Sequence, residues 1–242
     1  PSNLGLLSPR ELFRASLGVR LKGNFMAKTL KALLLTVSLM LPGVACATAQ
    51  VPDTIHIDGE EHDLNTNPLS AHLESVKWER PENIVISSAN WRGYIASWEV
   101  KDEQLLLIDV TVLVGGAGRG DYVKKSILTE LFPSSQPGVP ASWYSGALIV
   151  PQGEITNYVH MGYDSSYESY QVLRVDAGRI TEHLKLSSDE FEQYKDEKFE
   201  EFSATDEFRE SLDRLREEAD GMTEEQIIGF MRSFFTERYL SL

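Results

Sequence analysis

Hydrophobic and polar residues alternate most regularly between residues 90 and 114. Successive residues of an extended strand point to opposite faces, so the alternation in 91–100 indicates a strand with one buried face. Residues 101–104 are polar, and 105–114 are dense in Leu, Ile and Val, as in a mostly buried strand. The pattern predicts a long β-hairpin. The expected cross-strand pairs are Val100 with Leu105, Trp98 with Leu107, and Tyr94 with Thr111.

Further strands and turns are predicted in the region before Ser187. We expect strands over 54–57 and 83–87, a short helix over 69–78 and an amphipathic segment over 123–132. Two further hairpins are predicted from turn-forming residues. One joins 143–150 to 154–161 around Pro151-Gln152-Gly153, and the other joins 172–175 to 180–186 around Asp176-Ala177-Gly178.

From Ser187 onward the periodicity becomes helical. Ser187 with Glu190, and Thr223 with Gln226, have the spacing of capping boxes that begin helices. A helix near 206–219 lies between them. Successive hairpins followed by helices predict an α+β fold, with an antiparallel sheet over about 52–186 and three helices over about 188–240 packed on it.

The N-terminal region has the pattern of an export signal. Met26 begins a short basic region, 32–41 is apolar, and Ala47-Thr48-Ala49 fits a signal peptidase site. We therefore predict an upstream leader over 1–25, a signal peptide over 26–49, and a mature domain over 50–242. The apolar run is too short to span a bilayer, which needs roughly 20 residues.

Cys46, the only cysteine, gives an alternative to this cleavage. A small residue precedes it, as in a lipoprotein signal, although Gly43 stands where Leu is usual. Cleavage after Ala49 predicts a periplasmic or extracellular protein without disulfides. Cleavage before Cys46 instead predicts an outer-membrane lipoprotein anchored by lipid at Cys46.

Charge narrows the classes of partner. Six of the 23 basic residues and one of the 37 acidic residues precede Gln50, which leaves 17 bases, 36 acids and a formal charge of −19. This net negative charge repels the phosphate backbone of nucleic acids, so nucleic-acid binding is not expected. Residues 182–225 hold 17 acids against 6 bases, which makes a basic protein partner one of the alternatives.

Aromatic and polar residues concentrate between 143 and 170. Tyr and Trp combine an apolar face with a polar tip, a combination suited to sugars, peptides or other small ligands. Arg92 is a candidate for holding a ligand carboxylate. The predicted binding residues are Arg92, Tyr94, Trp143, Tyr144, Tyr158, His160, Tyr163, Tyr167 and Glu168.

Catalytic motifs are missing from the sequence. It has no nucleophile elbow and no zinc-protease helix motif, and the Gly-rich stretch 115–121 has Asp121 where either phosphate-binding fingerprint requires another residue. No catalytic residue, metal or cofactor is predicted. A hydrolase that uses His160 with Glu154 or Glu168 is the enzymatic alternative.

Three stretches carry a resemblance: WRGYIASWEV, WYSGALIVPQGEITNYVHMGYDSSYESY and FEQYKDEKFEEF. They resemble stretches in a group of uncharacterised bacterial proteins, several of them exported. The resemblance covers most of the mature chain and implies a shared architecture, but no activity and no catalytic residue. The leading expectation is therefore an exported, non-enzymatic binding or interaction module whose ligand is a small molecule, glycan or protein.

Overall fold

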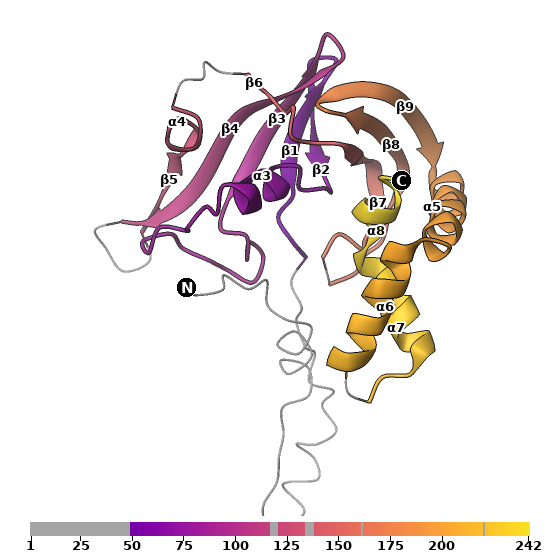
Figure 1. Cartoon of the computed structure of the whole chain (residues 1–242). Coiled ribbons are helices and arrows are strands. Elements are labelled where there is room, and N and C mark those ends of the chain that lie inside the picture. Colours follow the sequence, from indigo (N-terminus) through magenta and orange to yellow (C-terminus); the bar gives the residue numbers. More distant parts are fainter. Residues whose placement is uncertain (1–48, 117–120, 134–137, 161, 220) are drawn as a thin grey trace, which may run out of the picture.

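The computed structural model describes residues 49–116, 121–133, 138–160, 162–219 and 221–242. In this part of the chain it contains a nine-stranded, mostly antiparallel sheet and six helices, which confirms the predicted α+β class (Figure 1). The predicted leader, signal peptide and Cys46, and most of the Gly-rich stretch, lie outside the described residues. No helix of the described part is both long and apolar enough to cross a membrane.

The strands of the sheet are β1 (Asp53–Ile57), β2 (Glu60–Leu64), β3 (Ile95–Lys101), β4 (Gln104–Gly115), β5 (Tyr122–Ser126), β6 (Val139–Pro140), β7 (Gly146–Asn157), β8 (Ser166–Asp176) and β9 (Arg179–Ser187). The helices are α3 (Leu69–Ser75), α4 (Leu128–Leu131), α5 (Ser188–Ser203), α6 (Asp206–Glu218), α7 (Glu224–Phe234) and α8 (Thr236–Tyr239).

The sheet curls so that its two ends approach each other. Its order is β2-β1-β3-β4-β9-β8-β7, with β5 and β6 also paired to β4, and β1 runs parallel to β3. β4 and β9 share a single register pair, Gln104 with Arg179, where the sheet bends. At the opposite ends, the Asn65 amide donates to the Ile149 carbonyl at 2.8 Å, which brings the chain after β2 against β7. The curled sheet therefore has a concave and a convex face (Figure 1).

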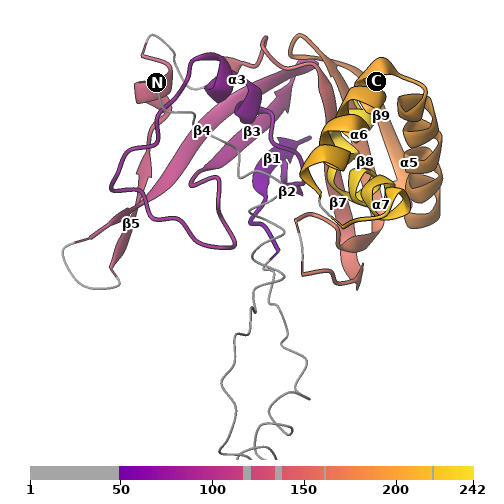
Figure 2. The ribbon, with the colours of Figure 1, turned by 60° about the horizontal axis from the view of Figure 1, so that its bottom comes forward.

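Each face of the sheet has its own hydrophobic core. The first core lies on the concave face and includes Trp98, Leu107 and Leu148. The second lies between β7, β8 and the C-terminal helices and includes Ile149 and Phe202. Figure 2 shows α5, α6 and α7 gathered on one side of the molecule, beside β7, β8 and β9. Because neighbouring residues of β7 serve opposite cores, this strand joins the two halves of the structure.

The central hairpin is confirmed with two changes: its first strand begins at Ile95 rather than at Trp91, and its register shifts once. Val100 pairs with Leu105 and Trp98 with Leu107, as predicted. A β-bulge between Ser97 and Trp98 then shifts the pairing, so that Ile95 rather than Tyr94 lies opposite Thr111. A bulge adds one residue to one strand, which explains why the prediction fails only beyond this point.

The predicted turn at 151–153 is wrong. These residues lie inside one continuous strand, β7, which pairs along its length with β8, and the register shifts between Gln152 and Ile155. The positive φ of 78° at Gly153 belongs to this irregularity rather than to a hairpin turn. Tertiary pairing with β8 thus overrides local turn chemistry.

Other local predictions are also corrected. Residues 83–87 form no strand and make only isolated bridges, and 123–132 divide into β5 and α4. The polar strand β2 was not predicted, because only Leu64 of it is buried. The predicted hairpin of 172–186 is confirmed as β8 and β9.

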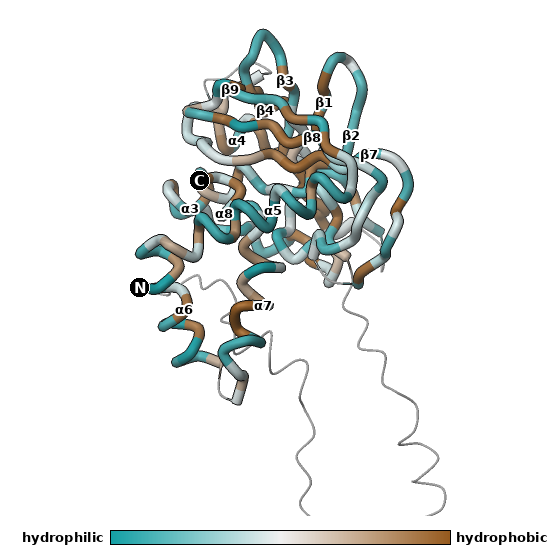
Figure 3. Tube along the Cα trace, turned by 90° about the vertical axis from the view of Figure 1, so that its right-hand side faces the viewer, coloured by the Kyte–Doolittle hydropathy of each residue, from teal (hydrophilic) through white to brown (hydrophobic). Residues whose placement is uncertain are grey.

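The helix starts are confirmed by their hydrogen bonds. Ser187 and Thr223 each form a complete capping box, at α5 and α7. The Thr205 side chain accepts from the Phe208 amide at the start of α6. In Figure 3, hydrophilic segments dominate α5 while hydrophobic segments lie along the strands, as expected for a helix that buries one face. A fourth C-terminal helix, α8, was not predicted.

Candidate functional site

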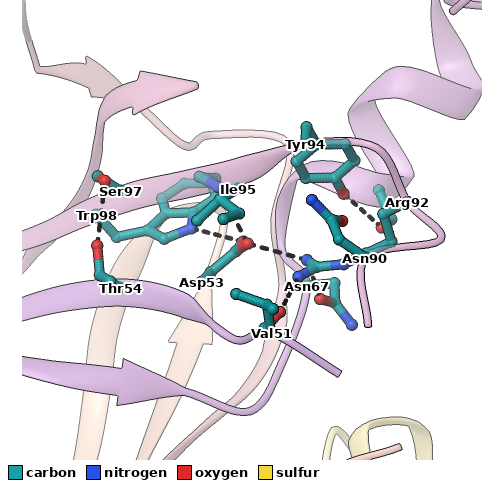
Figure 4. Close-up of polar contacts among 12 residues, drawn as sticks. Val51, Asp53, Thr54, Asn67, Asn90, Arg92, Tyr94, Ile95, Ser97 and Trp98 are labelled. Carbon is teal, nitrogen blue, oxygen red and sulfur yellow. Dashed lines mark hydrogen bonds and ion pairs between the residues drawn. The ribbon is translucent and has the colours of Figure 1, made fainter. Parts of the chain in front are cut away.

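A buried ion pair joins the start of β1 to the loop before β3 (Figure 4). Arg92 Nη1 lies 2.9 Å from Asp53 Oδ1, and the two side chains are 4% and 0% exposed. The Ala96 amide and the Trp98 indole also donate to Asp53, at 3.1 and 3.2 Å. Arg92 Nη2 donates to the Val51 carbonyl at 2.8 Å. A buried charge requires such partners, and here both charges have them.

Burial and pairing act in opposite directions on these two groups. Burial raises the pKa of Asp53, whereas the charge of Arg92 and the two N–H donors lower it. Burial lowers the pKa of Arg92, but the charge of Asp53 and the neighbouring Tyr163 and Tyr94 raise it above its ordinary value. Arg92 is therefore a cation fixed inside the protein rather than a free contact for a ligand carboxylate.

Two tyrosines of the predicted site belong to the same network. The guanidinium of Arg92 lies 5.1 Å from the centre of the Tyr94 ring, and the Tyr94 hydroxyl is 3.0 Å from Ser70 Oγ. Burial raises the pKa of Tyr94 to about 12. The Tyr163 hydroxyl donates to Asn67 Oδ1 at 3.1 Å, and burial also raises its pKa.

Asn67 extends the network to the C-terminal helices. Its Oδ1 accepts from Arg92 Nη1, and its backbone amide donates to Glu237 Oε2 at 3.2 Å. Glu237 belongs to α8, 170 residues further along the chain. A continuous series of polar contacts therefore runs from the ion pair to the carboxyl group of Glu237.

The carboxyl group of Glu237 is the most chemically distinctive group of this series. The Tyr144 hydroxyl donates to the Ala147 carbonyl at 2.8 Å and lies 3.3 Å from Glu237 Oε1. Burial raises the pKa of Glu237 from 4.5 to about 7, although the Asn67 amide and the Tyr144 hydroxyl lower it. A carboxyl group with such a pKa changes its charge near neutral pH.

Glu237 faces a groove of about 700 Å³, which we name the helix groove. Its lining residues come from the segment before β7 and from the C-terminal helices: Tyr144, Ser145, Glu207, Phe234, Phe235, Glu237, Arg238, Ser241 and Leu242. Phe234 is 44% exposed and Leu242 is 40% exposed, so apolar surface is accessible there. An apolar concavity with a few polar groups and a perturbed pKa is the usual character of a ligand site.

The structure places the other predicted binding residues elsewhere. Trp143 packs against His72 and Phe132, with ring centres 4.6 and 5.4 Å away, and its indole donates to the Pro68 carbonyl. Tyr158 and His160 are both exposed and form an edge-to-face pair with centres 4.6 Å apart. The predicted residues are thus spread over several places on the molecule, and only Tyr144 lines the helix groove.

Tyr167 lines a second, smaller cavity of about 320 Å³ between β2 and β7. Its other lining residues are Glu61, His62, Asp63, Pro151, Gln152 and Gly153. Burial and the nearby Glu61 raise the pKa of Asp63. Glu168 lies beside this cavity, where its Oε2 accepts from the Glu154 amide at 3.2 Å.

No cluster of three or more His, Cys, Asp or Glu side chains able to hold a metal occurs in the described part of the chain.

Comparison with known proteins gives no match. No protein-family model matches the chain, and neither does any curated protein or solved structure.

Sequence reasoning did not select Asp53, Asn67 or Glu237. Asp53 is the polar first residue of β1 and Asn67 lies in a polar loop, so the pattern of hydrophobic residues selected neither. Glu237 is one of 37 acidic residues, and its short helix has no cap made by a side chain. Of the residues in this network, the sequence pattern pointed only to Arg92, Tyr94, Tyr144 and Tyr163 as candidate binding residues.

The acidic helices contain many internal ion pairs. Lys195, Lys198, Arg209 and Arg216 each contact an acid on their own helix. Arg232 pairs with Asp196 and Arg238 with Glu207, which tie different helices together. Several of the cations on these helices are thus paired with nearby acids. Binding of a basic protein partner stays a prediction.

Proposed function

We infer that this protein is a non-enzymatic binding protein for a small amphipathic ligand, and that the ligand occupies the helix groove. The observation that carries this proposal is the placement of the Glu237 carboxyl and the Tyr144 hydroxyl beside accessible apolar side chains. Such a site buries the apolar part of a ligand and orients its polar group. Export of the protein is part of the same proposal and rests on the sequence of residues 26–49.

The hydrogen bonds made by the two serine hydroxyl groups of the groove favour a binding function over hydrolysis. Ser145 Oγ lies 3.3 Å from Asp176 Oδ1, and Ser241 Oγ donates to the backbone carbonyl of Glu237. Among the described residues, neither serine contacts a histidine or lysine that could activate it as a nucleophile. In the described part of the chain, the His160 side chain makes no hydrogen bond or ion pair with a carboxylate, as the alternative hydrolase requires.

The proposal is tested by thermal unfolding in the presence of a library of small amphipathic compounds. A ligand present at about 100 times its dissociation constant adds roughly 2.7 kcal/mol to the free energy of unfolding, which such a screen detects. Phe234→Ala removes exposed apolar surface from the groove. Tyr158→Ala is the matched control, because Tyr158 is an exposed aromatic residue outside it.

We expect compounds that stabilise the wild type and the Tyr158→Ala variant but stabilise the Phe234→Ala variant less. Stabilisation lost only in Tyr158→Ala would move the site to the predicted Tyr158 and His160 surface. A library without a single stabilising compound would overturn the proposed function.

A further inference from the structure

The charged side chains that line the helix groove do not all have a partner of opposite charge. It contains two acids, Glu207 and Glu237, and one base, Arg238. Arg238 Nε lies 2.5 Å from Glu207 Oε1, and its guanidinium lies 5.2 Å from the centre of the Phe235 ring. The single cation among the lining residues is therefore engaged by Glu207 and by an aromatic ring. In the described part of the chain, Glu237 forms no ion pair with a cation that lines the groove.

The two oxygens of Glu237 also differ in their hydrogen bonds. Oε2 accepts from the Asn67 amide at 3.2 Å. Among the described residues, Oε1 is contacted only by the Tyr144 hydroxyl at 3.3 Å, and that hydroxyl is 2.8 Å from the Ala147 carbonyl, its closer acceptor. A hydroxyl has a single proton to donate, so Oε1 retains capacity to accept a further hydrogen bond.

We propose that the ligand of the helix groove is an organic amine with an apolar body, whose ammonium group binds Glu237 Oε1. The apolar body lies against Phe234 and Leu242, the accessible apolar side chains of the groove. This inference rests on the proposed function and specifies the chemical class of the ligand. An ammonium group supplies both the missing donor and the missing positive charge.

Other ligand classes fit these residues less well. A carboxylate or phosphate would meet Glu207 and Glu237, and the one lining base is already paired. A neutral alcohol can donate to Oε1 but leaves the charge of the carboxylate uncompensated. The groove therefore discriminates by charge, and an amine is expected to bind more tightly than its alcohol or acid of equal chain length.

Protonation of Glu237 is expected to control this binding. Burial raises the pKa of this carboxyl to about 7; the titratable or charged groups that interact with it are Tyr144, Asp53, Arg92 and Tyr163, and Glu207 and Arg238 line the same groove. An ammonium ion binds the ionised carboxylate, so the two equilibria are linked. Binding is expected to release protons near neutral pH and to weaken as the pH falls.

The test is calorimetric titration of the full chain with octylamine, octanol and octanoate. We expect octylamine to bind best, and its dissociation constant to rise at least about tenfold on lowering the pH from about 8 to about 5.5. The same rise is expected for Glu237→Gln at the higher pH. Glu225→Gln is the control, because Glu225 is an exposed acid on α7 that does not line the groove.

Three outcomes would contradict the proposal. Octanol or octanoate binding as tightly as octylamine would overturn the amine assignment while leaving the proposed binding function intact. An unchanged affinity in Glu237→Gln would overturn the role of this carboxylate. If none of the three probes binds, and the compound screen is also negative, both the amine assignment and the proposed function fail.

Discussion

Arg92 Nη1 lies 2.9 Å from Asp53 Oδ1, although 39 residues separate them in the sequence. The pair fixes the loop that precedes β3 against the beginning of β1. Through Asn67 it is also connected to Glu237 in the helix groove. The same interactions that hold the two halves of the fold together therefore position the proposed ligand-binding carboxylate.

Removing one member of this pair is expected to destabilise the protein strongly. Arg92→Met leaves Asp53 buried without its counter-charge, which costs about 3–5 kcal/mol of unfolding free energy. Urea denaturation measures the change. Arg209→Met is the control, because Arg209 pairs with Asp206 on the surface and exposed pairs contribute only about 0–1 kcal/mol. Equal, small losses in both variants would contradict the structural role of the buried pair.

The stability of the protein is expected to depend on pH through Glu237. Burial raises its pKa from 4.5 to about 7, so the folded protein holds this proton more tightly than the unfolded chain. Its stabilising contribution is therefore complete below the unfolded pKa and is lost as the pH rises through the folded value. Relative to Glu237→Gln, the wild type should be less stable at about pH 8 than at about pH 5.

Urea denaturation of both proteins at the two pH values checks this prediction. Glu225→Gln, an exposed substitution on α7, should retain the pH dependence of the wild type. The prediction is wrong if Glu237→Gln also retains it.

Gly153 is expected to be intolerant of a side chain. Its φ of 78° is unfavourable for other residues by roughly 1–2 kcal/mol, and an added Cβ would lie 3.0 Å from Glu168 Cβ. Gly153→Ala should therefore lower the midpoint of thermal unfolding. Gly115→Ala is the matched control in another strand, where an added Cβ meets nothing within 4 Å. Equal midpoints for the two variants would show that the irregularity of β7 imposes no such requirement.

Gly229→Ala is expected to stabilise the protein, in contrast to Gly153→Ala. It lies inside α7, is exposed, and an added Cβ would meet nothing within 4 Å. Glycine costs about 1 kcal/mol relative to alanine within a helix. Gly229→Ala should therefore raise the unfolding free energy by up to about 1 kcal/mol in urea denaturation. Gly221→Ala should lower it, because Gly221 has a φ of 87°. A loss of stability in Gly229→Ala would contradict the position of this residue in α7.

Local patterns in the sequence were sufficient to predict the elements in which near neighbours decide the structure. The capping boxes at Ser187 and Thr223 fix helix starts through residues three positions apart. The pair of Val100 with Leu105 follows directly from the polar turn between them. Arg92 and Tyr94 were also named as candidate binding residues, but β3 begins only at Ile95, and both side chains are buried in the loop before it.

Only the tertiary structure decided which distant residues meet. Pairing with β8 turned the expected turn at Pro151-Gln152-Gly153 into the interior of β7, and a bulge at Ser97 shifted the register of the central hairpin. Burial raises the pKa of Glu237 only when α8 packs against distant parts of the chain, and the Asn67 amide and the Tyr144 hydroxyl that it meets there partly offset this rise. Burial and long-range hydrogen bonds create these properties. They depend on how the sheet curls and where the helices pack, which a one-dimensional pattern of residues does not encode.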